Sequence, residues 1–509
     1  MPFERSSGLL LHLTCLPSYG GIGDMGPAAY GFVDFLTASK QRLWQVLPLG
    51  PTGYGNSPYA AISAFAGNPL LVSLETLSDW GWIPQERIAG LPGRSGNVQF
   101  EDVFAVKMPL LFEAARNFLA RPRPEQWKGF ETYCRDNAGW LDDFALYSVL
   151  RRKFNSLPWN EWPAAIAHRE AAALAELRGQ EGEALSVEKA IQFAFDEQWS
   201  MLRRYCAQRD IRIIGDVAIF VNYDSADVWT HPENFELNED LSPMRVSGVP
   251  PDYFSATGQR WGNPLYKWDA LEERGFDWWV ERIRRSRELY DFIRLDHFRG
   301  FEAYWSIPAE DETAVGGVWV KAPGAALFSR LREVLGELPF IAEDLGVITP
   351  EVDALREQFH LPGMRILQFG FSDRGAHNYL PHKFVENTVV YTGTHDNDTT
   401  LGWWGTAGAA EKSAVHTYLH PGEEGVVWPM IRAAATSVAD ICLFPVQDIL
   451  EIGSEGRMNT PSSSSDNWGW RCPEHVLGPA LAAKLAALTE VTDRDLLPES
   501  ASADASGEP

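Results

Sequence analysis

The chain has 509 residues, of which 45% are hydrophobic and 22% charged. This is ordinary usage for a soluble globular protein and excludes a disordered or fibrous body. A formal net charge of −25 opposes both nucleic-acid phosphates and anionic lipid surfaces, so neither nucleic acid nor membrane is an expected partner. Twenty Trp, 15 Tyr and 27 Phe exceed what core packing alone usually requires. Some of these rings fit the faces of neutral sugars, although an aromatic-rich core explains any single one equally well.

Neither the cysteines nor the first residues of the chain indicate an oxidising compartment. The five cysteines are scattered, without a CxxC pair or a Cys/His metal spacing. They are Cys15, Cys134, Cys206, Cys442 and Cys472. The segment MPFERSSGLLLHLTCLP has an acid and a base near its start and only a short apolar run, which suits neither a signal peptide nor a spanning helix. We expect a cytoplasmic monomer that uses no cofactor and no metal.

Short apolar runs rich in β-branched residues recur along the chain and predict eight strands. They span residues 8–14, 43–49, 211–217, 292–297, 340–344, 364–369, 388–395 and 440–446. Helix-like stretches such as 271–290 and 325–335 separate the later runs, which is the β-α-β rhythm of a parallel sheet. The sequence therefore predicts an α/β fold, a closed (β/α)8 TIM barrel.

Charged residues follow several of these runs, in the motifs GDV, RLDH, AED and THDND. A parallel strand that is buried on both faces should stay apolar, so carboxylates at the carboxyl ends indicate the functional face of a barrel. A single aspartate there could merely cap a loop. Four such ends together favour an active site.

A long insertion separates the second and third predicted strands, because roughly 160 residues far exceed an ordinary connection. Segments 125–154 and 164–204 carry apolar residues at spacings of three and four, which predicts amphipathic helices. A tail rich in Ser, Ala, Asp and Glu is expected to be disordered. The expected divisions are 1–60 for the start of the barrel, 61–205 for mainly helical insertion subdomains beside its mouth, 206–491 for the rest of the barrel, and 492–509 for the tail.

Two carboxylates have the placement that glycoside chemistry with retention requires. One carboxylate attacks the anomeric carbon and a second, protonated carboxyl assists the leaving oxygen, at a separation of about 5 to 5.5 Å. Asp296 and Glu343 end the fourth and fifth predicted strands, which are neighbours in a closed barrel. Arg294 shares a strand face with Asp296 and would keep it ionised. Burial beside a second carboxylate would raise the pKa of Glu343, so that it serves as the acid.

The seventh predicted strand runs into TGTHDNDTT. His395 and Asp396 offer a donor and an acceptor that could hold two hydroxyls of one sugar ring and favour its distortion. A metal site is the competing interpretation, because His, Asp, Asn and Asp fall within four positions. Hydrolases with two metals usually draw further histidine or thiolate ligands from elsewhere in the barrel, and no such ligands stand out here.

Six motifs carry a resemblance to a known family. They are QVLPLGPTGYGNSPY, GVPPDYFSATGQRWGNPLY, RLDHFRGFEAYW, AEDLGVITP, LPGMRILQF and YTGTHDNDTTLGWW. Together they resemble the amylomaltase or disproportionating-enzyme family, glycoside hydrolase family 77, which is related to the α-amylase barrel enzymes. The match runs from about Gly8 to Arg471.

The resemblance implies a 4-α-glucanotransferase, which moves α-1,4-glucan segments of starch, glycogen or maltodextrin to the 4-hydroxyl of an acceptor through a covalent glycosyl-enzyme. It implies that Asp296 is the nucleophile, Glu343 the acid/base, and Asp396 the residue that stabilises the transition state. It further implies an active-site loop at 248–266 that covers the glucan. Residues it places around the substrate are Tyr54, Ser57, Tyr59, Asp216, Trp261, Arg294, His297, Asp373, His395 and Asn467.

The chain departs from the family pattern at four places. Ala218 stands where the family commonly has Pro, and Asn56 where Asp is frequent. Phe100 replaces a tyrosine that serves a secondary glucan site in relatives, which leaves Tyr54 to supply that platform. The motif at Asn467 follows SSSSD and matches more loosely.

Two other functions remain open at this point. A hydrolase of the same clan would use the same catalytic trio, but the aromatic loop with Tyr253, Phe254 and Trp261 favours transfer because it can exclude water. A non-catalytic glucan-binding barrel would give no reason for carboxylates at neighbouring strand ends.

Overall fold

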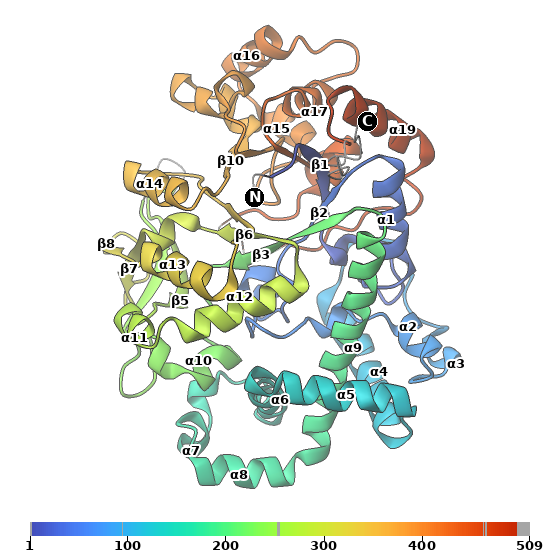
Figure 1. Cartoon of the computed structure of the whole chain (residues 1–509), viewed down its shortest axis with the longest axis vertical. Coiled ribbons are helices and arrows are strands. Elements are labelled where there is room, and N and C mark those ends of the chain that lie inside the picture. Colours follow the sequence, from blue (N-terminus) through green and yellow to red (C-terminus); the bar gives the residue numbers. More distant parts are fainter. Residues whose placement is uncertain (1–2, 94, 252–254, 462, 464–465, 496–509) are drawn as a thin grey trace, which may run out of the picture.

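In the computed structural model, eight parallel strands close into a barrel in the order β1-β12-β11-β10-β9-β6-β3-β2. The structure describes residues 3–495 except 94, 252–254, 462 and 464–465 (Figure 1). The barrel strands are β1 (Ser6–Leu10), β2 (Leu43–Gln45), β3 (Arg212–Ala218), β6 (Phe292–Asp296), β9 (Phe340–Ala342), β10 (Gly363–Ile366), β11 (Thr388–Tyr391) and β12 (Ile441–Pro445). All eight predicted strands are confirmed. Several end earlier than predicted because their last predicted residues belong to the loops of the functional face.

Bulky apolar side chains fill the interior of the barrel. They are Leu43, Ile214, Ile341, Met364, Ile366, Val389, Tyr391, Ile441 and Leu443. Each is at most 1% exposed, and full burial of such a side chain contributes about 1.5–3 kcal/mol. The Tyr391 hydroxyl donates to Gln45 Oε1 at 2.9 Å, so this interior phenol has a partner. A filled interior leaves the carboxyl ends of the strands as the place for a site.

Helices surround the barrel, and some sequence-predicted boundaries need correction. The predicted helix 271–290 is two helices, α11 (Trp268–Glu273) and α12 (Asp277–Leu289), because Gly275 and Phe276 adopt positive φ angles of 66° and 55°. The predicted helix 325–335 is α13 (Gly324–Leu335). Other helices are α1 (Pro27–Ala38), α10 (Ala226–Thr230), α14 (Pro350–Gln358), α15 (Thr400–Thr406), α16 (Ala409–Leu419), α17 (Val427–Ala435), α18 (Val446–Ile449) and α19 (Pro479–Val491).

The insertion between β2 and β3 is mainly helical, as predicted. Its helices are α2 (Leu74–Asp79), α3 (Gln85–Ile88), α4 (Phe100–Ala120), α5 (Pro124–Asp136), α6 (Ala138–Lys153), α7 (Ala164–Ala167), α8 (Ala171–Gln180) and α9 (Gly182–Ala207). An aromatic cluster joins them, in which Trp82 stacks on Phe118 at 4.1 Å and 11°. Figure 1 shows α9 running from these helices back toward the barrel, where the chain enters β3.

A four-stranded antiparallel sheet, which the sequence did not predict, lies beside the barrel in the order β5-β4-β7-β8. Its strands are β4 (Arg245–Val249), β5 (Gln259–Pro264), β7 (Ala303–Pro308) and β8 (Val318–Lys321). The expected loop 248–266 is therefore largely a β-hairpin, because β4 pairs with both β5 and β7. Tyr253 and Phe254, which we expected in this loop, lie outside the described residues.

The disordered tail was expected to begin at residue 492, but the structure describes the chain as far as residue 495. Arg494 is 0% exposed, and its guanidinium donates to the carbonyls of Ser6, Ala435, Ser437, Ala439 and Asp440. A charge can be buried when hydrogen bonds satisfy it, which is the reason that this segment is ordered. Residues 496–509 of the expected tail lie outside the described part of the chain.

Across the described residues, no helix combines the length and the hydrophobicity needed to cross a membrane.

Candidate active site

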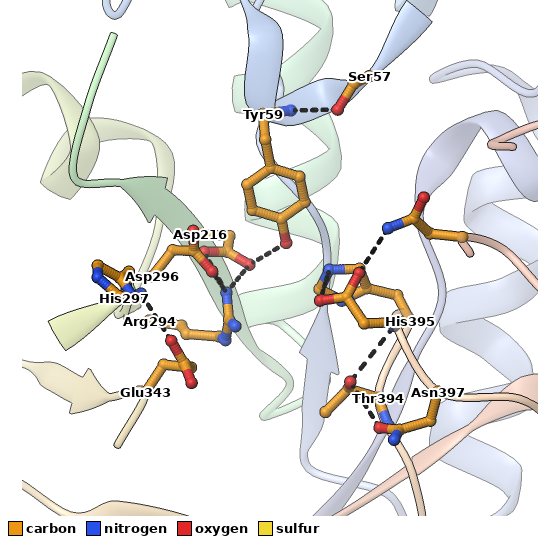
Figure 2. A network of polar contacts seen from close by, with 12 residues as sticks. Ser57, Tyr59, Asp216, Arg294, Asp296, His297, Glu343, Thr394, His395 and Asn397 are labelled. Atoms are coloured by element: carbon orange, nitrogen blue, oxygen red, sulfur yellow. Dashed lines mark hydrogen bonds and ion pairs between the residues drawn. The ribbon is translucent and has the colours of Figure 1, made fainter. Parts of the chain in front are cut away.

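Two paired barrel strands place the predicted catalytic carboxyls side by side. β6 ends at Asp296 and pairs with β9, which Glu343 follows directly. The backbone N–H of His297 donates to Glu343 Oε2 at 2.7 Å (Figure 2). The backbone N–H of Leu345 donates to Oε1 of the same carboxyl at 3.1 Å. The residue after Asp296 thus holds the carboxyl of Glu343 directly. The sequence prediction that these two residues lie on neighbouring strands is confirmed.

Glu343 has the environment of an acid. Its pKa is raised to about 8, chiefly by burial and also by the neighbouring charge of Asp296, against the opposing effects of Arg294 and the two backbone N–H groups. At neutral pH the protonated form is therefore favoured. A protonated carboxyl can donate its proton to a leaving oxygen.

Arg294 links two other carboxylates. It is 3% exposed, and its Nη1 atom lies 2.8 Å from Asp296 Oδ1 and 2.7 Å from Asp216 Oδ2. The Tyr59 hydroxyl donates to the same oxygen of Asp216 at 2.7 Å. Burial raises the pKa of Asp216 to about 7, while Arg294 opposes that shift. The permanent positive charge of the guanidinium thus lies between the carboxylates of Asp216 and Asp296.

His395 and Asp396 face this group from the loop after β11. Figure 2 shows His395 across the site from Asp296 and Glu343, with Tyr59 reaching between them. The His395 ring stacks on Tyr59 at a centroid distance of 5.2 Å and 15°. Burial lowers the pKa of His395, so its neutral form is favoured. Its Nε2 atom lies 3.4 Å from Asp396 Oδ2.

The metal interpretation of this loop gains no support from the structure. Within the described residues, no three His, Cys, Asp or Glu side chains gather as ligands for an ion. Asp398, which such a site would need, instead accepts hydrogen bonds from Thr399 N at 2.8 Å and Ser454 Oγ at 2.7 Å.

Side chains that the sequence reasoning missed fix this loop. Asp448, 1% exposed, accepts from the hydroxyl and backbone N–H of Thr400, both at 2.7 Å, and from the Thr392 hydroxyl at 2.5 Å. It thereby joins the two ends of the segment that carries His395 and Asp396. Asn459 Nδ2 donates to Asp396 Oδ1 at 2.6 Å. Asp448 lies three residues after a strand end, so the rule that found the other carboxylates could have found it.

Trp261 and His297 form part of the rim. The Trp261 indole is 39% exposed on β5 and meets the His297 ring edge-on at 4.8 Å and 85°. His297 adopts a left-handed backbone conformation with φ of 51°. Burial lowers its pKa to about 4, so it is neutral at physiological pH. Ser57 accepts from the Tyr59 backbone N–H at 3.3 Å and begins the short helix that carries that tyrosine.

The three remaining predicted residues are not joined to the catalytic trio by the described contacts. Asp373 is exposed and caps its own turn through Ala376 N at 3.1 Å. The Asn467 side-chain amide accepts a hydrogen bond from the Thr460 backbone N–H and donates one to the Ser463 carbonyl, both at 2.9 Å within its own loop. Tyr54 lies in a 3-10 turn, and its side chain is outside the described part of the structure.

These features define a class of protein. A closed (β/α)8 barrel that holds a buried, protonated carboxyl next to a carboxylate paired with arginine, at the carboxyl ends of adjacent strands, is the arrangement of barrel enzymes that act on glycosidic bonds.

Comparison with known proteins identifies the family within that class. A family model described as 4-alpha-glucanotransferase, glycoside hydrolase family 77, matches residues 11–476. The 4-alpha-glucanotransferase of Thermus thermophilus is 49% identical over 502 residues, 97% of this chain and 100% of its own length. That of Synechocystis is 44% identical over 497 residues, 96% of this chain and 98% of its own length. The solved amylomaltase of Streptococcus agalactiae in complex with acarbose superposes with a TM-score of 0.93 at 37% identity, covering 96% of this chain and 100% of that one.

The chain belongs to the 4-alpha-glucanotransferase family, and its activity is that of a 4-α-glucanotransferase.

Proposed function

We propose that this chain transfers α-1,4-glucan segments by double displacement, with Asp296 as nucleophile and Glu343 as acid/base. In the first step, Asp296 attacks the anomeric carbon while the proton of Glu343 passes to the leaving glycosidic oxygen. A covalent glycosyl-enzyme forms and the donor fragment leaves. In the second step, the Glu343 carboxylate takes the proton of the acceptor 4-hydroxyl, whose oxygen attacks the same carbon and releases Asp296.

One observation carries these assignments. Asp296 and Glu343 lie at the ends of paired strands in opposite electrostatic environments, one against the Arg294 guanidinium and the other buried with a raised pKa. Two neighbouring carboxyls in such different electrostatic environments can divide the roles of nucleophile and acid between them.

The other predicted residues would grip the reactive sugar. Asp396 and His395 would form hydrogen bonds with two hydroxyls of one sugar ring. These hydrogen bonds would strengthen as the ring distorts toward the oxocarbenium-like state. The half-buried ring of Tyr59 and the exposed indole of Trp261 would stack on sugar rings. Further contacts are proposed for Tyr54, Ser57, Asp216, Arg294, His297, Asp373 and Asn467, which match family positions in sequence.

Product analysis with maltotriose tests the proposal. Transfer should produce glucose together with maltopentaose and longer glucans, and Asp296→Asn should produce neither. Glucose and maltose alone would show that water is the acceptor, which would replace the proposed transfer by hydrolysis. Unchanged product formation by a folded Asp296→Asn variant would refute the nucleophile assignment.

We also propose that the protein works as a cytoplasmic monomer on neutral glucans, with residues 61–205 as subdomains beside the barrel mouth. The net charge of −25 and five free cysteines support this setting. Light scattering coupled to size exclusion checks the monomer, for which a mass near 56.9 kDa is expected.

A further inference from the structure

A second cavity, of about 370 Å³, lies between the insertion and the barrel. We call it the outer cavity and define it by Phe65, Asn137, Trp140, Asp143, Asn234 and Trp278. Its walls come from the junction of α5 and α6, from α10 and the turn after it, and from α12. None of the catalytic trio lines it. Its volume is within the range of about 300–1,000 Å³ that is usual for small-molecule sites.

Aromatic rings form one side of the outer cavity. Trp140 is half-buried and stacks on Phe65 at 6.4 Å and 19°. Trp278 meets Phe65 edge-on at 6.0 Å and 79°. The Trp140 Nε1–H already donates to Asn137 Oδ1 at 3.0 Å, which fixes the plane of the indole. A ring plane that is fixed and only half-buried offers a flat apolar surface to a ligand.

Apart from Asp227, the charged groups of the outer cavity are paired with one another or with near neighbours. Arg285 contacts Asp196 at 2.6 Å, His231 contacts Glu233 at 3.2 Å, and Arg284 pairs with Glu281. The remaining pairs are Arg285 with Glu288, Asp143 with Arg169 and Arg178, Arg274 with Asp277, and Asp136 with Arg135. An anionic or cationic ligand would have to compete for an occupied partner, so a neutral ligand is favoured.

Neutral ligands that combine an apolar face with many hydroxyls fit this lining. The carboxylates of Asp136 and Asp143 can accept from hydroxyls, and the Arg274 and Arg284 guanidinium groups can donate to them. The activity of this family supplies such a molecule. We propose that the outer cavity, whose described lining includes neither Tyr54 nor Phe100, binds a segment of α-1,4-glucan as a non-catalytic site separate from the Tyr54 platform, a proposal that rests on the glucan chemistry of the proposed function.

One wall of the outer cavity, formed by Ser63 and Phe65, belongs to the segment that also carries Tyr59. Ser63 and Phe65 line both the outer cavity and a smaller inner one, which Tyr59 and Asp216 line from the other side. Asp227, on the outer side, accepts from the Ala64 backbone N–H at 2.8 Å. A glucan held in the outer cavity therefore lies against the same short segment that shapes the active site. Long donors engaged at both places gain from effective concentration, whereas short ones gain nothing.

Gly139 allows a test that leaves the packing intact. It lines the cavity, and a Cβ built there meets no atom within 4 Å. Gly139→Gln would occupy the outer cavity, and Gly139→Ala, which adds only the Cβ atom, is its matched control. We expect Gly139→Gln to raise KM for amylose on the order of tenfold and to leave KM for maltotriose unchanged. Gly139→Ala should match the wild type on both donors.

A direct structural readout complements the kinetics. Crystals of Asp296→Asn soaked in maltotriose should show sugar rings against Trp140, and the additional change Trp140→Ala should remove them there while leaving sugar at Glu343. An empty outer cavity together with an unchanged amylose KM in Gly139→Gln would overturn the second site alone. A wild-type enzyme that leaves maltotriose unreacted would instead overturn the proposed function.

Discussion

Asp296 and Glu343 sit at the ends of two paired barrel strands, whereas His395 and Asp396 lie on a loop that side chains from later segments hold in place. Ladder hydrogen bonds and two backbone N–H groups fix the first pair, so their separation follows from the barrel itself. The carboxylate of Asp448 and the side-chain amide of Asn459 hold the second pair, His395 and Asp396, in place. The barrel itself therefore positions the proposed reacting groups, whereas tertiary contacts between loops position the residues proposed to bind the sugar.

We call Asp296 and Glu343 the strand-end half of the site, and His395 and Asp396 with their supports the loop half. Activity should be more sensitive to a single chemical change in the strand-end half. Asp296→Asn keeps the shape of the side chain but replaces the anionic nucleophile by an amide, so turnover should fall on the order of 10⁴-fold or more. Initial rates of glucose release from maltotriose measure this, with circular dichroism as the control for folding. A folded variant with wild-type turnover would show that Asp296 is not the nucleophile.

Glu343→Gln should lower the turnover rate about 10²–10⁴-fold, because the glutamine cannot donate a proton to the leaving oxygen. The pH profile identifies the role more sharply. Since burial raises the pKa of Glu343 to about 8, wild-type kcat/KM should fall as pH rises through that region and the acid is lost. The residual activity of the variant should lack this alkaline limb. A limb that persists unchanged in Glu343→Gln belongs to another group.

The same carboxyl should also make stability depend on pH. Its pKa is raised in the folded state, so its favourable contribution is complete below about pH 4.5 and is lost as pH rises through about 8. The loss approaches about 1.4 kcal/mol per pH unit within that window. Melting temperatures at pH 5 and pH 8 should therefore differ more for the wild type than for Glu343→Gln. Equal differences would mean that burial of Glu343 costs no stability.

In the loop half, Asp448 offers the cleanest test. Asp448→Ala removes the acceptor that joins Thr392 to Thr400, at a cost of about 1–3 kcal/mol for the groups left unpaired. We expect kcat/KM to fall about tenfold as His395 and Asp396 lose their position. Asp448→Asn can donate to both threonine hydroxyls and accept from the Thr400 N–H, so it should retain most of the activity. Similar losses in both variants would instead indicate a need for the charge.

Trp261→Ala should give the smallest effect on rate and the most informative effect on products. If the indole over His297 excludes water, its removal should weaken donor binding and raise the ratio of hydrolysis to transfer. Trp319 is the matched control, because it is also 39% exposed and lies in the same antiparallel sheet, against Arg299. A weaker affinity with an unchanged product ratio would make Trp261 a binding platform only.

The sequence located the strand-end half of the site for a physical reason. Barrel strands are short, nearly continuous apolar runs, so a carboxylate such as Glu343 at the end of one is conspicuous without any knowledge of its neighbours. All eight strands and the adjacency of Asp296 and Glu343 could be predicted in this way. The helical insertion was likewise evident from its spacing of apolar residues.

Long-range pairing could not be predicted from local patterns. The antiparallel sheet consists of short strands that contain Gly248, Gly262 and Pro264, and its edge strands β5 and β8 are largely exposed, so its stability depends on cross-strand neighbours. The burial of Arg494 depends on carbonyls from residues 6 and 435–440, which the polar composition of its own segment does not reveal. The supports of Asp396 come from residues more than 50 positions later for the same reason.

The position of Arg494 also determines how late in synthesis the barrel can close. It joins the carbonyl of Ser6, at the start of β1, to that of Asp440, just before β12, and these two strands meet where the barrel closes. Arg5 reaches the same turn after α17 through Ala435 and Ser437. A nascent chain emerges from the ribosome with its first strand long before Arg494. The outer edge of β1 therefore stays unpaired through nearly the whole of synthesis, until β12 is made, and it is the surface that a chaperone would have to shield.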